Sequence, residues 1–506
     1  MGHTLQLGQV AHAGFAAFAQ VVDQKQQAVQ AVLDAGAIQG HVNLRLDLSP
    51  ILPVHYDHQQ TGAGTNRFEK KLALDNYDQY SRSYPLRVTT YLRPANNSPS
   101  FSEQNMKQHI LIIGAGFGGM WSALSATRLL EQHGRNDVSV SVLAPQAELR
   151  IRPRFYETDV QQMKAPLAEL FTAVGVNFIQ GAVDEIDVAG KRVGYRDGQG
   201  LQQVLGYDRL VMASGSGVVR PNLAGLDEHA FDVDQIESAS RLEQHIKALA
   251  QRPGSTARNT VVVAGGGFTG IETASEMPAR LRAVLGQDAE VKVIIVDRGN
   301  KIGAALGEGI SPAIVEASAA LGVEWRLNAS VAAVDADGVT LADGQRIEAS
   351  TVVWTVGVRA SALTEQVPGQ RDGHGRLHVD GNLKVIGQEH VFATGDVAYA
   401  ATDDLGNHAL MTCQHAIALG RHSGNNVAAD LLGVEPLPYR QPKYVTCLDL
   451  GAWGAVYTEG WQREVKLIKD EAKTLKQQIN SVWIYPPAAD RAIALAAADP
   501  LIPVVA

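Results

Sequence analysis

A short apolar strand that runs into a glycine-rich turn and then a helix is the feature that most constrains this chain. The strand Ile110–Ile113 leads into Gly114-Ala115-Gly116-Phe117-Gly118-Gly119. In this pattern Gly114 permits a tight bend, Gly116 lets a pyrophosphate approach the backbone, and Gly119 lets the helix pack against the strand. The helix N-terminus then offers free N–H groups and a partial positive charge to the phosphates. A glycine-rich turn that binds no ligand is the alternative.

The same pattern returns about 150 residues later, where the strand Thr260–Ala264 precedes Gly265, Gly267 and Gly270. A single glycine pattern is weak because other turns satisfy it, but two copies in the same strand–turn–helix context are much stronger. The sequence therefore predicts two dinucleotide-binding domains.

The residue at the end of the strand after each turn indicates which dinucleotide binds there. Strand 291–297 ends in Asp297, whose carboxylate would bond ribose hydroxyls and repel the 2′-phosphate of NADP. NAD is favoured there, although Arg298 is adjacent to Asp297. Strand 138–144 ends in Ala144, where an acid is expected, so the first ribose lacks its usual partner.

Composition allows a large core, since 45% of the 506 residues are hydrophobic and 19% are charged. From Met106 onward, strand-like and helix-like runs alternate, which is typical of parallel α/β sheets. The predicted strands are 138–144, 207–213, 260–264, 291–297, 351–356 and 390–393.

Charge, cysteine content and hydropathy argue against several classes of protein. A net charge of −9 without a long Lys/Arg block argues against nucleic acid as a partner. Cys413 and Cys447 form neither a CxxC pair nor a Cys-rich metal site, so no metal is expected. No run of 18 apolar residues occurs, and the first basic residue is Lys25, unlike in a signal peptide. We expect a cytoplasmic protein.

Later stretches complete the pattern. "YDRLVMASGS" (207–216) and "VVWTVGVRA" (352–360) look like strands that cross between the domains of a flavoprotein, and "VFATGDVA" (391–398) contains Gly395 and Asp396. With "IRPRFYE" (151–157) and "CQHAIALGR" (413–421), they make residues 106–435 resemble the two-dinucleotide-binding-domain flavoproteins. Within these, the chain resembles the type II NADH dehydrogenases.

The resemblance implies an α/β fold with two Rossmann-like domains, in which an NAD domain interrupts an FAD domain and an α/β tail region follows. The expected parts are an N-terminal extension (1–105), a discontinuous FAD-binding domain (106–225 and 355–435), an NAD-binding domain (226–354) and a C-terminal tail region (436–506).

The resemblance also implies the cofactors and the reaction. FAD would bind at the first turn and at Gly395 and Asp396, whose carboxylate bonds the ribityl chain, and NADH would bind at the second turn and Asp297. NADH would pass a hydride to FAD, and a quinone or another small acceptor would take the electrons. A homodimer and a peripheral contact with the inner face of the cell membrane are left open.

Two polar residues are candidates for catalytic roles. Glu272 would stand near the stacked rings, with a carboxylate favoured by a helix N-terminus as the alternative. Gln414 would bond the flavin pyrimidine edge or an acceptor carbonyl, with a helix-surface amide as the alternative. The family's quinone-contact stretch has Ala and a second Gln where this chain has Cys413 and Leu419. We expect Cys413 to be a small core residue.

Two other functions remain open: a soluble NAD(P)H-dependent reductase of a protein electron carrier, and a flavoprotein that senses NADH with slow turnover. Disulfide reductases of this fold need a proximal cysteine pair, which the sequence lacks. Thiol-based peroxidases and NADH oxidases use a cysteine after the second strand, and residues 145–160 contain none.

The tail carries an amphipathic pattern over residues 462–480. Its apolar residues are three or four positions apart, which predicts a helix: Val465, Ile468, Ala472, Leu475 and Ile479. Lys466, Lys469, Lys473 and Lys476 would lie on the other faces. This helix would pack against the protein or a second subunit, or lie on a membrane.

The N-terminal extension carries eight basic and eight acidic residues, one credible helix over 11–34 and no chemical constellation. We expect residues 1–105 to be dispensable, with native translation beginning at Met106 as one explanation. A regulatory or docking domain is the alternative.

Overall fold

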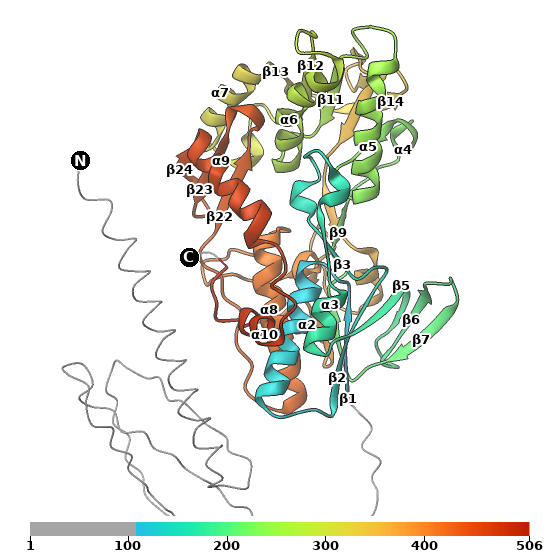
Figure 1. Cartoon of the computed structure of the whole chain (residues 1–506), viewed down its shortest axis with the longest axis vertical. Coiled ribbons are helices and arrows are strands. Elements are labelled where there is room, and N and C mark those ends of the chain that lie inside the picture. The colour runs from blue at the N-terminus through green and yellow to red at the C-terminus, as the bar shows by residue number, and fades with distance from the viewer. Residues whose placement is uncertain (1–107, 505–506) are drawn as a thin grey trace, which may run out of the picture. The chain divides into compact units, whose positions relative to one another are not determined.

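The computed structural model describes residues 108–504, in which two parallel sheets carry the fold (Figure 1). The first sheet has seven strands in the order β20-β8-β1-β2-β5-β6-β7. Neighbours from β20 to β5 pair in parallel, and β6 and β7 add an antiparallel edge. The strands are β1 (Gln108–Ile113), β2 (Val138–Ala144), β5 (Asn177–Asp187), β6 (Arg192–Asp197), β7 (Gln202–Gly206), β8 (Arg209–Met212) and β20 (Val391–Ala393).

The second sheet has five parallel strands in the order β10-β17-β11-β12-β13. A three-stranded antiparallel sheet, β14-β15-β16, packs on one of its faces through a shared hydrophobic cluster. The strands of both are β10 (Ala230–Phe231), β11 (Thr260–Ala264), β12 (Lys292–Val296), β13 (Val323–Arg326), β14 (Val331–Asp335), β15 (Gly338–Leu341), β16 (Arg346–Glu348) and β17 (Thr351–Trp354).

Both sheets are buried on two faces, because alternate residues of their central strands enter different hydrophobic clusters. In β1, Ile110 and Ile112 pack on the helix side, whereas Leu111 and Ile113 pack on the opposite side. Burial on both faces explains why these strands are continuous apolar runs rather than alternating ones.

Helices cover the sheets and connect their strands. α2 follows β1 and packs along α8; an added Cβ at Gly424 would lie 2.1 Å from the carbonyl oxygen of Ser122, so glycine permits this close approach. The helices are α2 (Phe117–Gln132), α3 (Ala168–Val174), α4 (Leu226–His229), α5 (Ile236–Ala248), α6 (Phe268–Leu285), α7 (Ser311–Leu321), α8 (Cys413–Leu432), α9 (Lys469–Gln478) and α10 (Arg491–Ala497).

Two short strands join the halves of the molecule. β9 (Ser216–Val218) leaves the first sheet, β18 (Val358–Ala360) returns from the second, and the two pair antiparallel. The remaining short strands are β3 (Glu148–Arg150), β4 (Lys164–Pro166), β19 (Leu377–His378) and β21 (Ala398–Tyr399).

The tail corrects one sequence prediction. Residues 462–480 do not form one helix: β24 (Glu464–Ile468) pairs with β23 (Ala455–Glu459), which pairs with β22 (Val445–Asp449), and α9 begins only at Lys469. The apolar spacing wrongly predicted a helix here, because Val465 and Ile468 belong to strand β24. Its pairing with β23 is a tertiary contact that the spacing of apolar residues does not reveal. Within α9 the buried residues are Ala472 and Lys476, so the lysine expected on an outer face is buried.

The α/β fold with two Rossmann-like sheets is confirmed, and so are the six predicted strands, to within two residues at each end. The domain boundaries stay a prediction, and the predicted helix over 11–34 lies outside the described residues. None of the helices described between residues 108 and 504 is both long enough and apolar enough to span a bilayer.

Candidate active site

In the first glycine-rich turn, packing requires glycine at two positions but not at a third. Gly114 has a φ of +108°, and an added Cβ would lie 2.3 Å from the carbonyl oxygen of Ala213. A Cβ on Gly119 would lie 1.9 Å from the carbonyl oxygen of Gly114. Gly116 has an ordinary φ of −69°, and its Cβ would meet nothing within 4 Å. The open space beside Gly116 fits the close approach of a ligand phosphate.

The second turn likewise has two positions where the backbone or packing requires glycine and one where neither does. Gly265 has a φ of +105°, and a Cβ on Gly270 would lie 1.9 Å from the carbonyl oxygen of Gly265, whereas a Cβ on Gly267 would meet nothing within 4 Å. Asp297 stands beside this turn, because its Oδ2 accepts a hydrogen bond of 2.7 Å from the N–H of Gly266. The structure therefore brings together the four residues predicted to bind the second dinucleotide.

The helices that begin at both turns leave their N-termini free for an anion. Neither α2 nor α6 has a side-chain cap or an acidic residue in its first turn. Free N–H groups and the helix dipole at such an end attract negative charge.

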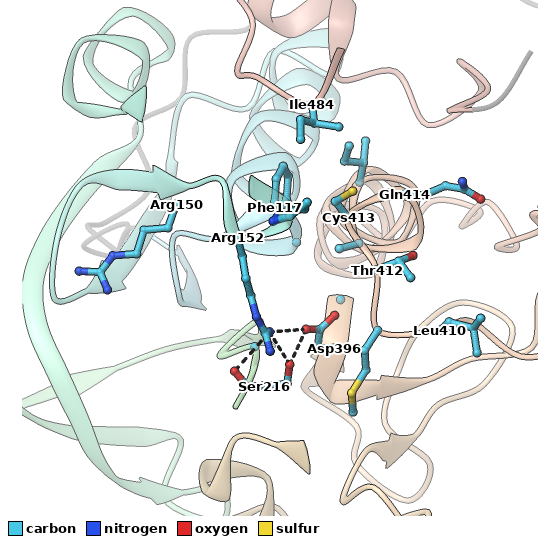
Figure 2. A pocket seen from close by; sticks show the side chains of 18 of the residues that line it. Phe117, Arg150, Arg152, Ser216, Asp396, Leu410, Thr412, Cys413, Gln414 and Ile484 are labelled. Atoms are coloured by element: carbon cyan, nitrogen blue, oxygen red, sulfur yellow. Dashed lines mark hydrogen bonds and ion pairs between the residues drawn. The ribbon is translucent and has the colours of Figure 1, made fainter. Parts of the chain in front are cut away.

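A cavity of about 1290 Å³ joins the first turn to the rest of the candidate site. Its wall includes Gly114, Gly116, Gly395 and Asp396 from the first domain, and Glu272 at the start of α6. The tail closes another side; Figure 2 shows Ile484 near Phe117 and Cys413. Gly119 and the glycines of the second turn lie outside this wall.

Asp396 lies in a hydrogen-bonded cluster that the sequence did not reveal. Its Oδ2 accepts hydrogen bonds from Ser216 Oγ at 2.6 Å and from Arg152 Nη1 at 3.3 Å (Figure 2). Arg152 also pairs with Asp234. Burial raises the pKa of Asp396, and Arg152 and Ser216 oppose that rise. Among the described residues no donor bonds Asp396 Oδ1, so this oxygen can accept a ligand hydroxyl.

Glu272 is buried and belongs to a charged network between α6 and the tail. Its Oε1 accepts a hydrogen bond of 2.8 Å from Lys476 Nζ and one of 3.1 Å from the N–H of Asp449. Lys473 bonds Asp449 Oδ1 at 2.6 Å. Burial raises the pKa of Glu272, and the Lys476 ammonium opposes that rise. A buried carboxylate in a cavity wall can hold a proton near reacting groups.

Gln414 and Cys413 open helix α8 and line the same cavity. Gln414 donates a hydrogen bond of 3.1 Å to the carbonyl oxygen of Val445 and accepts one of 3.3 Å from Gln441, so the tail orients its amide. Burial raises the pKa of Cys413 to about 11, so its thiol stays protonated at neutral pH. Cys413 packs partly against the core and also faces the cavity, which modifies the prediction of a core residue.

Four residues of the site escaped sequence reasoning. Arg152 and Ser216 lie inside the stretches 151–157 and 207–216, where no periodicity distinguishes them from their neighbours. Lys476 and Arg463 come from the tail, whose contacts depend on how it folds back. A buried lysine has no mark in sequence, because the same residue type usually lies on a solvated face.

Comparison with known proteins gives consistent results. A family model described as pyridine nucleotide-disulphide oxidoreductase matches residues 108–420. An NADH dehydrogenase-like protein of Mycobacterium tuberculosis is 46% identical over 399 residues, which cover 77% of this chain and 98% of that protein. A demethylphylloquinone reductase of Synechocystis is 29% identical, covering 69% and 86% of the two chains. The structure of NDH2 from Plasmodium falciparum in complex with NADH has a TM-score of 0.63 at 16% identity, covering 75% and 96% of the chains.

Proposed function

The chain belongs to the pyridine nucleotide-disulphide oxidoreductase family, and we propose that it is an FAD-dependent NADH dehydrogenase that passes electrons to a quinone. The resemblance to type II NADH dehydrogenases is confirmed by the relatives it matches. One observation carries the proposal: a single cavity connects the first glycine-rich turn, the start of α6 at Glu272 and an apolar wall from the tail.

FAD fits the first domain. Gly114 and Gly119 would shape the turn, Gly116 would admit the pyrophosphate, and Asp396, held after the left-handed Gly395, would bond the ribityl chain. NADH fits the second domain, where Gly265, Gly267 and Gly270 form the turn and Asp297 would bond the adenosine ribose. When bound, FAD takes a hydride from NADH and passes electrons on to the acceptor.

The chain's own residues orient the reactants and hold protons. We propose that Glu272 holds a proton at its carboxylate. Burial favours the protonated form of this group, whereas the Lys476 ammonium favours the ionised form. Gln414 would orient the flavin edge or an acceptor carbonyl with its amide, which the tail already fixes. Reduction of a quinone to a quinol takes up two protons, and a buried carboxylate beside the cavity suits that need.

The tail supplies the apolar surface that a quinone requires. Several apolar side chains of this region line the cavity: Leu475, Ile479, Trp483, Ile484, Pro503 and Val504. Trp483 is also 55% exposed, and two further apolar residues of the tail, Val482 and Leu501, are 61% and 72% exposed. We propose that this rim rests on the inner face of the cell membrane, from which a quinone enters the cavity.

The test is to purify the chain, identify its flavin by mass spectrometry, and follow flavin reduction by NADH. Reoxidation of the flavin is then measured with a quinone, with dyes and with an oxidised carrier protein such as ferredoxin. FAD and rapid turnover with quinone are expected. FMN in place of FAD would contradict the cofactor assignment. Turnover only with the protein carrier, or reduction without turnover, would replace the proposal by a carrier reductase or an NADH sensor.

The membrane contact has its own test. Full-length protein should float with anionic lipid vesicles in a density gradient, and Trp483→Ser should weaken that flotation without loss of bound flavin. Equal recovery of both proteins from the lipid-free fraction would contradict it.

A further inference from the structure

Arg463 belongs to the tail, yet its side chain reaches the start of helix α6. It is the last residue of the turn between β23 and β24, and its N–H donates a hydrogen bond of 2.9 Å to the carbonyl oxygen of Gly460. Nη1 donates a bond of 2.7 Å to the carbonyl oxygen of Leu306, in the segment after β12. The guanidinium carbon lies 5.6 Å from the ring centre of Phe268, the first residue of α6, and 5.9 Å from that of Tyr444. Two parts of the molecule thus hold this side chain in the cavity wall.

The charge of Arg463 has no carboxylate partner among residues 108–504. Its Nε is buried and bonds no acceptor within that range. The other two arginines that line the cavity differ, because Arg150 pairs with Glu148 and Arg152 with Asp234. Removing a guanidinium from water without an anion costs free energy, so an unpartnered one in a cavity wall is suited to an anionic ligand.

The backbone conformation at Arg463 also indicates a functional role for its side chain. Its φ of +52° lies in the left-handed region, which glycine adopts more readily than arginine does. Such a conformation persists where the surroundings determine it, and it directs the side chain toward Leu306 and Phe268. The turn therefore has an arginine where glycine would adopt the backbone conformation with less strain.

The start of α6 next to Arg463 offers backbone N–H groups to a phosphate. α6 begins after Gly267, beside which there is open space, and its first turn has neither a side-chain cap nor an acidic residue. The second glycine-rich turn brings the pyrophosphate of a dinucleotide to this helix end. An arginine can bond two phosphate oxygens at once and is the side chain best suited to that task.

We propose that Arg463 binds the pyrophosphate of NADH, so that the C-terminal tail completes the dinucleotide site of the second domain. The inference rests on the proposed function, since it assigns a further residue to the same NADH site. It also makes the tail part of substrate recognition rather than only a cover over the flavin.

The test compares two hydride donors in the intact holoenzyme. NADH carries the pyrophosphate, whereas reduced nicotinamide riboside carries the same ring and no phosphate. Arg463→Gln should lower kcat/KM for NADH roughly 10- to 100-fold, mainly through KM, and leave kcat/KM for the riboside unchanged. Arg463→Lys should restore part of the loss. Lys466→Gln is the matched control, because Lys466 is exposed on β24, the strand that begins directly after Arg463, and pairs with Glu464.

Equal losses with both donors would overturn the inference, since a purely structural arginine would affect every substrate alike. An unchanged KM for NADH in Arg463→Gln would also overturn it. If NADH does not reduce the flavin of the unmodified protein, the proposed function is wrong. The arginine is then judged by calorimetry with ADP-ribose, whose affinity should still fall at least tenfold in Arg463→Gln, and an unchanged affinity would refute the inference.

Discussion

At the residue scale, we predict that the carboxylate of Asp297 sets the preference for NADH over NADPH. It accepts hydrogen bonds of 2.7 Å from the N–H groups of both Gly266 and Gly299, so its charge is fixed beside the second turn. A 2′-phosphate brought to the same place would meet a like charge in a partly desolvated site.

Asp297→Asn should therefore narrow the preference for NADH over NADPH, measured as the ratio of kcat/KM values, by roughly tenfold or more. Asparagine keeps an acceptor oxygen for the turn and removes the charge. Asp343→Asn is the control, since Asp343 accepts from the N–H of Gln345 in an exposed turn elsewhere. Equal use of both nucleotides by the unmodified protein would refute the assignment.

His415 links one residue to the pH dependence of stability. It is fully buried, bonds Thr412 Oγ through Nδ1 at 2.9 Å, and stacks on Tyr444. Burial lowers its pKa to about 4, against 6.5 for the ordinary group. Below pH 6.5 the unfolded chain takes up a proton that the folded chain refuses until about pH 4, so stability falls as the pH is lowered through this window.

We expect the free energy of unfolding to fall by roughly 2–3 kcal/mol more in the unmodified protein than in His415→Phe between pH 7 and pH 4.5. Phenylalanine keeps the stacking on Tyr444 and removes the titrating group. Urea unfolding at both pH values measures the difference, with the exposed His133→Phe as control. Parallel losses in His415→Phe and the unmodified protein would show that other groups carry the acid sensitivity.

The strand–turn–helix unit at Gly114–Gly119 shows how an element divides its glycines between packing and binding. Gly119 is needed because any Cβ would collide with the Gly114 carbonyl oxygen at 1.9 Å. Gly116 faces open space in an ordinary backbone conformation. Substitution by alanine should therefore separate the two roles.

Gly119→Ala should lower the free energy of unfolding of the flavin-free protein by about 1–3 kcal/mol, because it overpacks the turn. Gly116→Ala should leave that free energy nearly unchanged and weaken FAD binding at least tenfold. Thermal unfolding of the apoprotein and fluorescence titration with FAD give the two quantities. A destabilised Gly116→Ala apoprotein with normal FAD affinity would contradict the division.

At the scale of one element, helix α9 buries a lysine that its sequence pattern predicts to be exposed. Lysine in an amphipathic pattern normally lies on a solvated face, yet Lys476 is only 7% exposed. It bonds Glu272 at 2.8 Å and the carbonyl oxygen of Cys447 at 2.9 Å. The helix buries this lysine because α6 presents a carboxylate that compensates its desolvation.

At the scale of the whole molecule, the candidate site needs parts that are far apart in the chain. The cavity wall draws on residues from Gly114 to Val504, and the tail contributes both apolar side chains and charged ones. The Mycobacterium tuberculosis relative matches this chain over 399 residues, which are 98% of its own length. The matched span therefore corresponds to nearly the whole length of that relative.

We expect residues 106–506, expressed without the N-terminal extension, to keep FAD occupancy and NADH turnover within about twofold of the full chain. Their melting temperature should lie within a few degrees of that of the full chain. Absorbance, calorimetry and steady-state kinetics on both proteins measure this. Loss of flavin or a collapsed melting transition in the shorter chain would show that the extension belongs to the fold, as the docking-domain alternative requires. Peptide mapping of the native N-terminus would decide separately where translation begins.

The sequence by itself determined the two strand–turn–helix units, the order of the strands along the chain and the identity of the dinucleotides. These features are local: a positive φ at Gly114 or Gly265 and an apolar run of five residues are constrained by their immediate neighbours. Asp297 and Asp396 could be located for the same reason, because Asp297 directly follows β12 and Asp396 lies in the short turn after β20.

Only the tertiary structure decided which charges meet. Glu272 and Lys476 are 204 positions apart, and Arg152 and Asp396 are 244 apart. Residues 464–468 became a strand because β23 offered a hydrogen-bonding edge, which outweighed a helical apolar spacing. Pairing and desolvation depend on distances between elements, and a one-dimensional pattern contains no such distances.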